Sequence, residues 1–154
     1  MAQPARVLEA ADVRRLIRHV RGHRHATRDH VMVLLSFAAG LRACEVAGLD
    51  WSMVLKANGR VNHLMHVAGS IAKNGTARQI PIHPDLKTAL VRLCREQGSP
   101  RAGPVIRSER GDHLTARSVV NWFAATYAEL GLDGCSSHSG RRTFDSQRLS
   151  LIHI

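Results

Sequence analysis

The sequence is poor in aromatic residues and contains no long apolar run. Its 154 residues include three phenylalanines, two tryptophans and one tyrosine, so aromatic residues make up only 4% of the chain. A protein that recognises RNA by stacking bases needs an aromatic platform, and this composition argues against one. No apolar stretch approaches the roughly 20 residues that cross a bilayer, and the basic residues are not gathered on one amphipathic helix. These two absences argue against a membrane partner.

Cysteine is also scarce. Cys44, Cys94 and Cys135 are odd in number, lie far apart and form no CxxC pair. This usage is typical of buried thiols in a reducing compartment, so we expect a cytoplasmic protein.

Acidic residues are too few to balance the basic ones. Lysine and arginine total 22 against 12 acidic residues, which gives a formal net charge of +10. Nineteen of the basic residues are arginines and only three are lysines. The excess of positive charge favours a polyanionic partner, with nucleic acid as the leading candidate.

The apolar pattern predicts a single α+β domain that is mainly helical and carries a small antiparallel sheet. Hydrophobic residues make up 44% of the chain, enough for a real core. Strand-like patterns occupy 61–68 and 77–82, and residues 104–106 suggest a short buried strand. Thr27, Asp85 and Thr115 stand where helix caps are expected. Helical patterns cover 7–20, 28–39, 86–94 and 119–127, and another helix is expected to start near residue 138.

A tight hairpin is predicted between the two strands. Residues 73–76 contain the pair Asn74 and Gly75, which prefers a two-residue turn. Lys73 should therefore stand at the end of a strand beside the turn. The alternative is that this lysine serves only solubility.

The segment 37–49 contains the first candidate site. Gly40 can end the preceding helix in the left-handed conformation, and a second apolar pattern restarts at Ala43. Arg42 lies between the two helices, with Glu45 one turn away to orient it. A guanidinium held in this way is prepared to bind an oxyanion. The alternative is an arginine and glutamate pair that only stabilises the turn.

A second cluster of anion-binding residue types lies near the end of the chain. Ser136 or Ser137 can cap a helix whose first turn would present His138, Arg141 and free backbone N–H groups. His138 and Arg141 are three positions apart and should share one face.

Four histidines, at positions 19, 23, 25 and 30, suggest a metal site. No carboxylate or cysteine joins them at ligand spacing, and ten histidines in the chain make a chance cluster easy. We therefore expect a solvated basic loop and no metal.

Three motifs occur in an order that resembles one protein family. They are GLRACE at residues 40–45, Lys73 followed by RQIPI at residues 78–82, and HSGR at residues 138–141. With helices and a hairpin between them, these motifs resemble the catalytic domain of the tyrosine recombinases, the phage integrase family. The resemblance runs from about Leu8 to Phe144.

The resemblance implies a reaction and assigns roles to five residues. In this family a tyrosine attacks a DNA phosphodiester, forms a 3′-phosphotyrosyl link and expels a 5′-hydroxyl, with no metal or other cofactor. Arg42 and Arg141 match the arginines that hold the non-bridging oxygens. Lys73 matches the lysine that protonates the leaving oxygen, and His138 matches the histidine that assists proton transfer at the nucleophile. Glu45 matches the supporting acid.

The chain also departs from the family pattern. The family continues after the position of Phe144 to a second histidine or tryptophan and then to the nucleophilic tyrosine, and residues 145–154 do not supply either. The only tyrosine, Tyr127, falls on the apolar face of a predicted helix and is expected in the core. The family's amino-terminal DNA-clamping domain is not matched either. No residue of the 154 is therefore assigned as nucleophile.

The sequence thus predicts a tyrosine-recombinase catalytic core over residues 1–154 that lacks the family's carboxy-terminal part. The expected role is site-specific recombination or integration, limited in this fragment to binding double-stranded DNA. The alternative is a non-catalytic DNA-binding or regulatory module with the same fold. Whether copies of the full-length protein associate on DNA is left open by the sequence.

Overall fold

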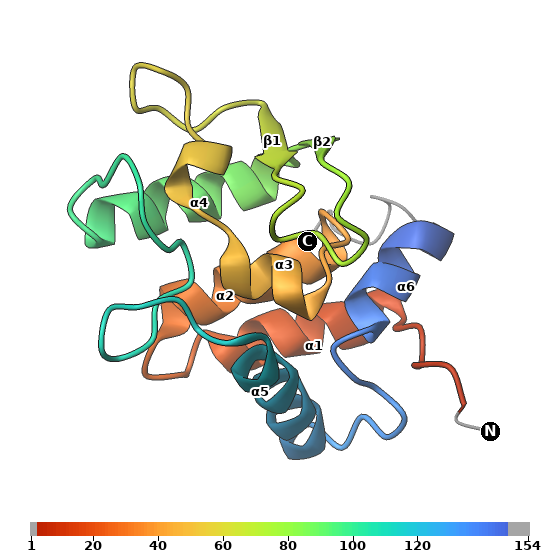
Figure 1. The fold of residues 1–154 in the computed structure, drawn as a ribbon. Coiled ribbons are helices and arrows are strands. Elements are labelled where there is room, and N and C mark those ends of the chain that lie inside the picture. Colours follow the sequence, from red (N-terminus) through yellow and green to blue (C-terminus); the bar gives the residue numbers. More distant parts are fainter. Residues whose placement is uncertain (1–2, 148–154) are drawn as a thin grey trace.

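The computed structural model describes residues 3–147. Its architecture is mainly helical with one two-stranded antiparallel sheet, which confirms the predicted fold class. Figure 1 shows the helices gathered around a central helix, α2, with the sheet and α4 on one side and α1 and α5 on the other. The elements are α1 (Ala10–Val20), α2 (Ala26–Phe37), α3 (Ala43–Gly48), the 3-10 helix η1 (Trp51–Met53), β1 (Leu64–Val67), β2 (Arg78–Pro81), α4 (Pro84–Glu96), α5 (Ala116–Glu129) and α6 (Ser139–Gln147).

The centre of the fold is α2, because its second half is apolar on every face. All residues from Val31 to Phe37 are buried. A helix that is hydrophobic all round has to be covered on all sides. Accordingly, α2 packs against α1, α3, α4 and α6. No helix within residues 3–147 has the length and apolar character needed to cross a membrane.

Two of the three predicted helix caps are wrong. The helix assigned to 28–39 begins at Ala26, and Thr27 instead donates a hydrogen bond from its hydroxyl to Glu96. At the start of α4, Asp85 is not the capping residue. The cap is His83, whose ring accepts a hydrogen bond from the Asp85 backbone N–H. In both cases a long-range contact or a neighbouring side chain replaced the local cap.

The cap at Thr115 is confirmed. Its hydroxyl accepts a hydrogen bond from the Ser118 backbone N–H at 3.0 Å, and α5 ends just before Gly131, whose φ is +69°.

The predicted strand at 104–106 is not a strand. Pro104 forms only an isolated bridge with Asp50, while Val105 and Ile106 are buried in the core.

The strands are shorter than predicted and the tight hairpin is wrong. β1 and β2 pair from Leu64 opposite Pro81 to Val67 opposite Arg78, which leaves 68–77 as a long connecting loop. Ile71 from this loop packs closely on Gly48 at the end of α3, where an added methyl group would lie 2.7 Å from the Ile71 side chain. Anchoring of the loop on α3 therefore overrides the local preference of Asn74 and Gly75 for a two-residue turn.

Candidate functional site

The turn between α2 and α3 sets the position of Arg42. Gly40 has φ +66°, and the Leu41 backbone N–H donates back to the Leu35 carbonyl at 3.0 Å. Leu41 is buried, so the chain is anchored immediately before Arg42. Arg42 itself is extended and precedes the first residue of α3. The predicted left-handed conformation of Gly40 and the restart at Ala43 are confirmed, whereas α2 ends at Phe37 and not at Ala39.

Glu45 fixes the backbone of Arg42 and not its guanidinium. The Arg42 backbone N–H donates to Glu45 Oε1 at 2.9 Å. The side chain that pairs with the Glu45 carboxylate is Arg78, at the start of β2. Its Nη2 donates to Oε1 at 2.9 Å and its Nη1 donates to Oε2. The interpretation of Glu45 as the residue that orients the Arg42 side chain is therefore corrected.

The environment of Glu45 stabilises its charged form. The side chain is 0% exposed, and this burial alone would raise its pKa. The hydrogen bonds from the Arg78 side chain and the Arg42 backbone, together with the charges of both arginines, outweigh that effect and leave the pKa of Glu45 below its ordinary value. The pair ties α3 to β2 and makes the backbone next to Arg42 rigid.

Sequence analysis gave Arg78 no role, although it belongs to one of the quoted motifs. Arg78 and Glu45 are 33 positions apart, so helix or strand spacing could not pair them. The only available signal was a buried acid in an apolar segment, which requires a cationic partner from elsewhere in the chain.

The guanidinium of Arg42 is available for a ligand. Its side chain is partly exposed, and within residues 3–147 it makes no hydrogen bond or ion pair. The alternative prediction is that Arg42 and Glu45 form a side-chain pair that only stabilises the turn. The Arg42 guanidinium makes no such pair with Glu45.

α6 brings Arg141 to the same turn. Arg141 Nη1 donates to the Gly40 carbonyl at 2.8 Å, although the two residues are 101 positions apart. Arg141 Nε also lies 3.7 Å from Asp145 one turn along α6. The guanidinium is half-buried and keeps further N–H groups free. The Arg141 guanidinium thus lies at the carbonyl of Gly40, two residues before Arg42.

Two glycines allow this close approach of α6 to α2. A methyl group at Gly40 would lie 2.6 Å from the Phe144 ring, and one at Gly140 would lie 1.8 Å from Ser36 Oγ. Gly140 was part of a quoted motif, and its packing role was not predicted. Arg141 depends on this contact because it follows Gly140 directly.

His138 lies immediately before α6, which begins one residue later than expected. The hydroxyl of Ser136 accepts a hydrogen bond from the His138 backbone N–H at 3.2 Å, so it holds the turn before α6 and caps no N–H group within the helix. The His138 ring is exposed and has no partner in the described part of the chain.

Lys73 lies in the exposed part of the 68–77 loop. Its ammonium group has no hydrogen-bond or ion-pair partner among residues 3–147. Figure 1 shows the loop between β1 and β2 descending beside α3 toward α6. No direct contact joins Lys73 or His138 to either arginine in the described residues. The described contacts therefore tie Arg141 to the turn that carries Arg42, and a common site for the four predicted residues stays a prediction.

Tyr127 belongs to the core, as predicted. It is 1% exposed and stacks on Phe123 with ring centroids 6.0 Å apart. Burial raises the pKa of its hydroxyl far above the ordinary value. A buried phenol that resists ionisation is poorly suited to attack a phosphate on the surface.

The predicted solvated loop of histidines is wrong for three of its members. His19 contacts Glu129, His23 contacts Asp29 and His25 contacts Glu109, each through a ring nitrogen. Within residues 3–147, the one group of side chains whose donor atoms are close enough to share a metal ion is His19, His23 and Glu129.

Comparisons with known proteins agree on one family. The sequence model of the phage integrase family matches residues 6–150. A putative integrase/recombinase y4rE of Sinorhizobium fredii is 33% identical over 129 residues, which cover 79% of this chain and 40% of that protein. Tyrosine recombinase XerC of Pseudomonas putida is 31% identical over 130 residues, covering 80% of this chain and 40% of the relative. The chain thus spans about two fifths of the length of these relatives.

Solved structures share the fold. The integrase from mycobacterium phage Brujita superposes with a TM-score of 0.66 at 26% identity, over 94% of this chain and 44% of that one. The crystal structure of XerA recombinase gives a TM-score of 0.72 at 17% identity, over 97% of this chain and 52% of that one. The lambda integrase bound to DNA gives 0.68 at 21% identity, over 96% of this chain and 54% of that one.

Proposed function

Since the chain belongs to the phage integrase family, we propose that it acts in site-specific DNA recombination, as the part of a tyrosine recombinase that binds the phosphodiester to be cleaved. The observation that carries this proposal is the hydrogen bond from Arg141 to the Gly40 carbonyl, which brings a second guanidinium to the turn that holds Arg42. Arg141, held by this hydrogen bond, and Arg42, held through its backbone, are suited to bind the two non-bridging oxygens of one phosphate.

The proposed chemistry depends on charge that develops during the reaction. When a tyrosine oxygen bonds to phosphorus and the bond to the 5′-oxygen breaks, the phosphate passes through a pentacoordinate state with more negative charge than the ground state. Arg42 and Arg141 would stabilise that state most, because their positions are set before the substrate binds.

Lys73 and His138 receive the proton-transfer roles in this proposal. Lys73 would donate a proton to the departing 5′-oxygen, and His138 would assist proton removal at the nucleophile. Both side chains are exposed and without partners among residues 3–147, as groups that wait for a substrate should be. No metal or cofactor enters the reaction. The free thiols of Cys44, Cys94 and Cys135 support a cytoplasmic location.

Affinity for a fluorescent DNA duplex tests the phosphate site. Arg42→Ala and Arg141→Ala should each weaken binding about tenfold or more, because a charge-assisted hydrogen bond contributes about 1.5–3 kcal/mol. Arg18→Ala is the matched control, since Arg18 is an exposed arginine of α1 that makes no ion pair within the described residues. Equal losses in all three variants would reject a specific phosphate site at Arg42 and Arg141.

A non-catalytic DNA-binding module with the same fold is the second candidate, and the buried Tyr127 supplies a nucleophile to neither. Fusing a carboxy-terminal segment of a related recombinase, with its histidine and tyrosine, separates the two. A folded fusion that forms a covalent DNA adduct, and loses it with Arg141→Ala, supports a catalytic core. A folded fusion that binds DNA without an adduct supports the module.

A further inference from the structure

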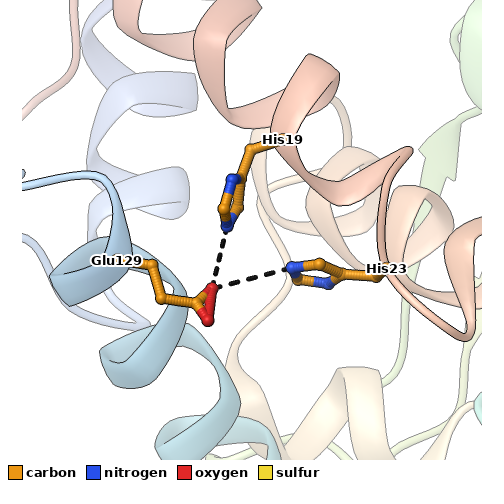
Figure 2. Close-up of side chains that lie close together, drawn as sticks. All are labelled: His19, His23 and Glu129. Carbon is orange, nitrogen blue, oxygen red and sulfur yellow. Dashed lines mark hydrogen bonds and ion pairs between the residues drawn. The ribbon is translucent and has the colours of Figure 1, made fainter.

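We propose that His19, His23 and Glu129 form a binding site for a zinc-type divalent metal ion at the contact between α1 and α5. The site is separate from Arg42 and Arg141 and does not depend on the recombination proposal. Figure 2 shows the two imidazoles and the carboxylate pointing toward one another. His19 Nε2 lies 2.8 Å from Glu129 Oε1, His23 Nε2 lies 3.7 Å from the same oxygen, and the three donor atoms are all within 4.8 Å of one another.

The backbone holds these three side chains in place. His19 lies in the last turn of α1, and His23 follows one turn later. Backbone hydrogen bonds continue the turn past the helix end, from Gly22 N–H to the His19 carbonyl and from His23 N–H to the Val20 carbonyl. Glu129 is the last residue of α5. Two of the ligands therefore stand on two different helices, and the third stands on the hydrogen-bonded turn that follows α1.

A buried carboxylate sets the hydrogen position on the His23 ring. His23 Nδ1 lies 2.8 Å from Asp29 Oδ2, and Arg28 donates to the other oxygen of Asp29 from Nε at 3.0 Å. Asp29 is buried and ion-paired with Arg28, so its carboxylate accepts the hydrogen of His23 Nδ1. This leaves the lone pair of Nε2 directed toward Glu129. A carboxylate behind a ligating histidine is the arrangement that fixes tautomer and ring orientation in metal sites.

The spacing of His23 and Glu129 leaves room for a cation between them. At 3.7 Å, Nε2 and Oε1 are too far apart for a good hydrogen bond, and in the tautomer with its hydrogen on Nδ1 the His23 ring presents a lone pair to the carboxylate. In a tetrahedral zinc site with bonds of about 2.0–2.1 Å, ligand atoms are roughly 3.3 Å apart, a value between the two distances at Glu129 Oε1. Small side-chain rotations would therefore complete the coordination.

The donor set selects the type of ion. Two imidazole nitrogens and one carboxylate oxygen suit zinc and related transition metals, whereas calcium and magnesium prefer oxygen ligands. The side chains of His19, His23 and Glu129 are 31%, 21% and 52% exposed, so an ion and a water molecule as fourth ligand can reach them. The ion would fasten the end of α1 to the end of α5.

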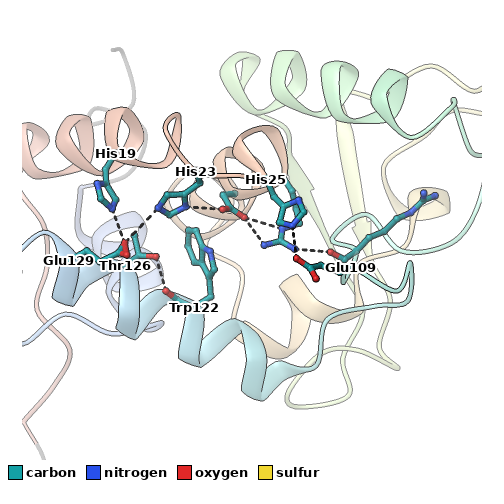
Figure 3. Close-up of polar contacts among 10 residues, drawn as sticks. His19, His23, His25, Glu109, Trp122, Thr126 and Glu129 are labelled. Carbon is teal, nitrogen blue, oxygen red and sulfur yellow. Dashed lines mark hydrogen bonds and ion pairs between the residues drawn. The ribbon is translucent and has the colours of Figure 1, made fainter.

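The sequence predicts no metal here, because no carboxylate follows the histidines at ligand spacing. The missing ligand comes from 110 positions away in the chain. Figure 3 follows the polar contacts from Glu129 past His23 to His25 and Glu109, with the Trp122 indole beside His23. The ring centroids of His23 and Trp122 are 6.0 Å apart, which places a fluorescent reporter next to the site.

Zinc titration of the metal-free full chain by calorimetry tests the proposal. The parent should bind one zinc ion more than Glu129→Gln or His19→Gln, or bind it at least tenfold more tightly. Glutamine keeps hydrogen-bonding capacity at both positions, but it removes the imidazole nitrogen at position 19 and the carboxylate charge at position 129. His66→Gln, which changes an exposed histidine of β1, should bind zinc like the parent.

Two further measurements distinguish a metal site from a hydrogen-bonded cluster. Zinc should raise the melting temperature of the parent but not of Glu129→Gln, and Ni²⁺ should quench the Trp122 fluorescence of the parent more than that of Glu129→Gln. Asp29→Asn, checked for folding by circular dichroism, should weaken zinc binding by about 10–100-fold. Equal zinc binding in the parent, His19→Gln and Glu129→Gln would overturn the proposal and leave a histidine and glutamate clip without metal.

Discussion

At the scale of single residues, the candidate site depends on charged groups whose partners differ from those that spacing suggests. Glu45 leaves the Arg42 guanidinium unpaired by taking Arg78 as its side-chain partner. Arg141 donates one N–H to the Gly40 backbone carbonyl, and this hydrogen bond fixes the orientation of the guanidinium without neutralising its charge. Both contacts keep positive charge available at the end of α2 for an anionic ligand.

Replacing Glu45 should destabilise the protein in a pH-dependent way. Glu45→Gln should lower the free energy of unfolding at pH 7 by about 1.5–3 kcal/mol, because Arg78 loses charge-assisted hydrogen bonds. The folded-state pKa of Glu45 lies below the ordinary value of 4.5, so its contribution is fully present above pH 4.5. It is lost as the pH falls through the folded-state pKa, and the difference between parent and variant should shrink.

Urea unfolding at pH 7, 5, 4 and 3 measures this effect. Glu9→Gln serves as the control, since Glu9 is exposed and has no ion pair in the described residues, and it should track the parent throughout. A difference between parent and Glu45→Gln that stays constant from pH 7 to pH 3 would contradict the assignment.

The single tyrosine should not act as a nucleophile. Covalent attack requires the tyrosine oxygen within about 3–3.5 Å of phosphorus, and Tyr127 is buried against Phe123. Incubation of the chain with a nicked suicide DNA substrate, followed by a denaturing gel, should give no shifted band. A band that disappears with Tyr127→Phe would show that Tyr127 does attack DNA and would contradict the prediction.

At the scale of elements, the packing of α6 on the end of α2 decides whether the site exists. The contact has glycine on both sides, Gly40 against Phe144 and Gly140 against Ser36. Because Arg141 follows Gly140, any shift of α6 moves its guanidinium away from the Gly40 carbonyl. The packing of α6 on α2 therefore also sets the position of the Arg141 guanidinium.

Gly140→Ala should destabilise the protein, although alanine is the better helix former by about 1 kcal/mol. The added methyl group would meet Ser36 Oγ at 1.8 Å and the Ser36 backbone carbon at 2.9 Å, so α6 has to move. Overpacking of this kind costs about 1–3 kcal/mol, and DNA affinity should fall with it because Arg141 is displaced. Gly22→Ala, where the nearest atom lies at 3.5 Å, is the control.

Thermal unfolding and DNA binding of both variants provide the measurements. A Gly140→Ala protein with the stability and DNA affinity of the parent would mean that α6 does not pack on Ser36 as described.

At the scale of the whole molecule, local signals in the sequence predicted the elements, and long-range contacts decided the rest. The apolar run from Val31 to Phe37 defined the central helix, and the Thr115 cap placed α5, because both signals act within a few residues. The hairpin at Asn74 failed because Ile71 is anchored on α3. A local preference of a few tenths of a kcal/mol to about 1 kcal/mol is easily overridden by tertiary packing.

In the candidate site, too, local motifs indicated the residues, and long-range contacts determined their partners. Arg42 and Arg141 could be named from their motifs, but the hydrogen bond that brings Arg141 to Gly40, in the turn before Arg42, joins positions 101 apart. The partners Arg78 for Glu45 and Glu129 for His19 also lie far along the chain, at separations of 33 and 110. Helical and strand periodicity carries no information over such distances, so only the fold could supply these pairs.

The net charge of the molecule predicts how DNA binding responds to salt. With a formal charge of +10 and nineteen arginines, most of the binding free energy should come from release of counterions from the DNA backbone. If about five to seven phosphates are contacted, the logarithm of the association constant should fall with the logarithm of salt concentration at a slope of about −5 to −6. Fluorescence anisotropy from 50 to 250 mM salt, on two duplexes of unrelated sequence, measures the slope.

Arg42→Ala and Arg141→Ala should each make the slope less steep by about one, since each removes one phosphate contact. An unchanged slope in both variants would place the DNA on another face of the protein, while a slope near zero in the parent would exclude backbone charge as the source of binding.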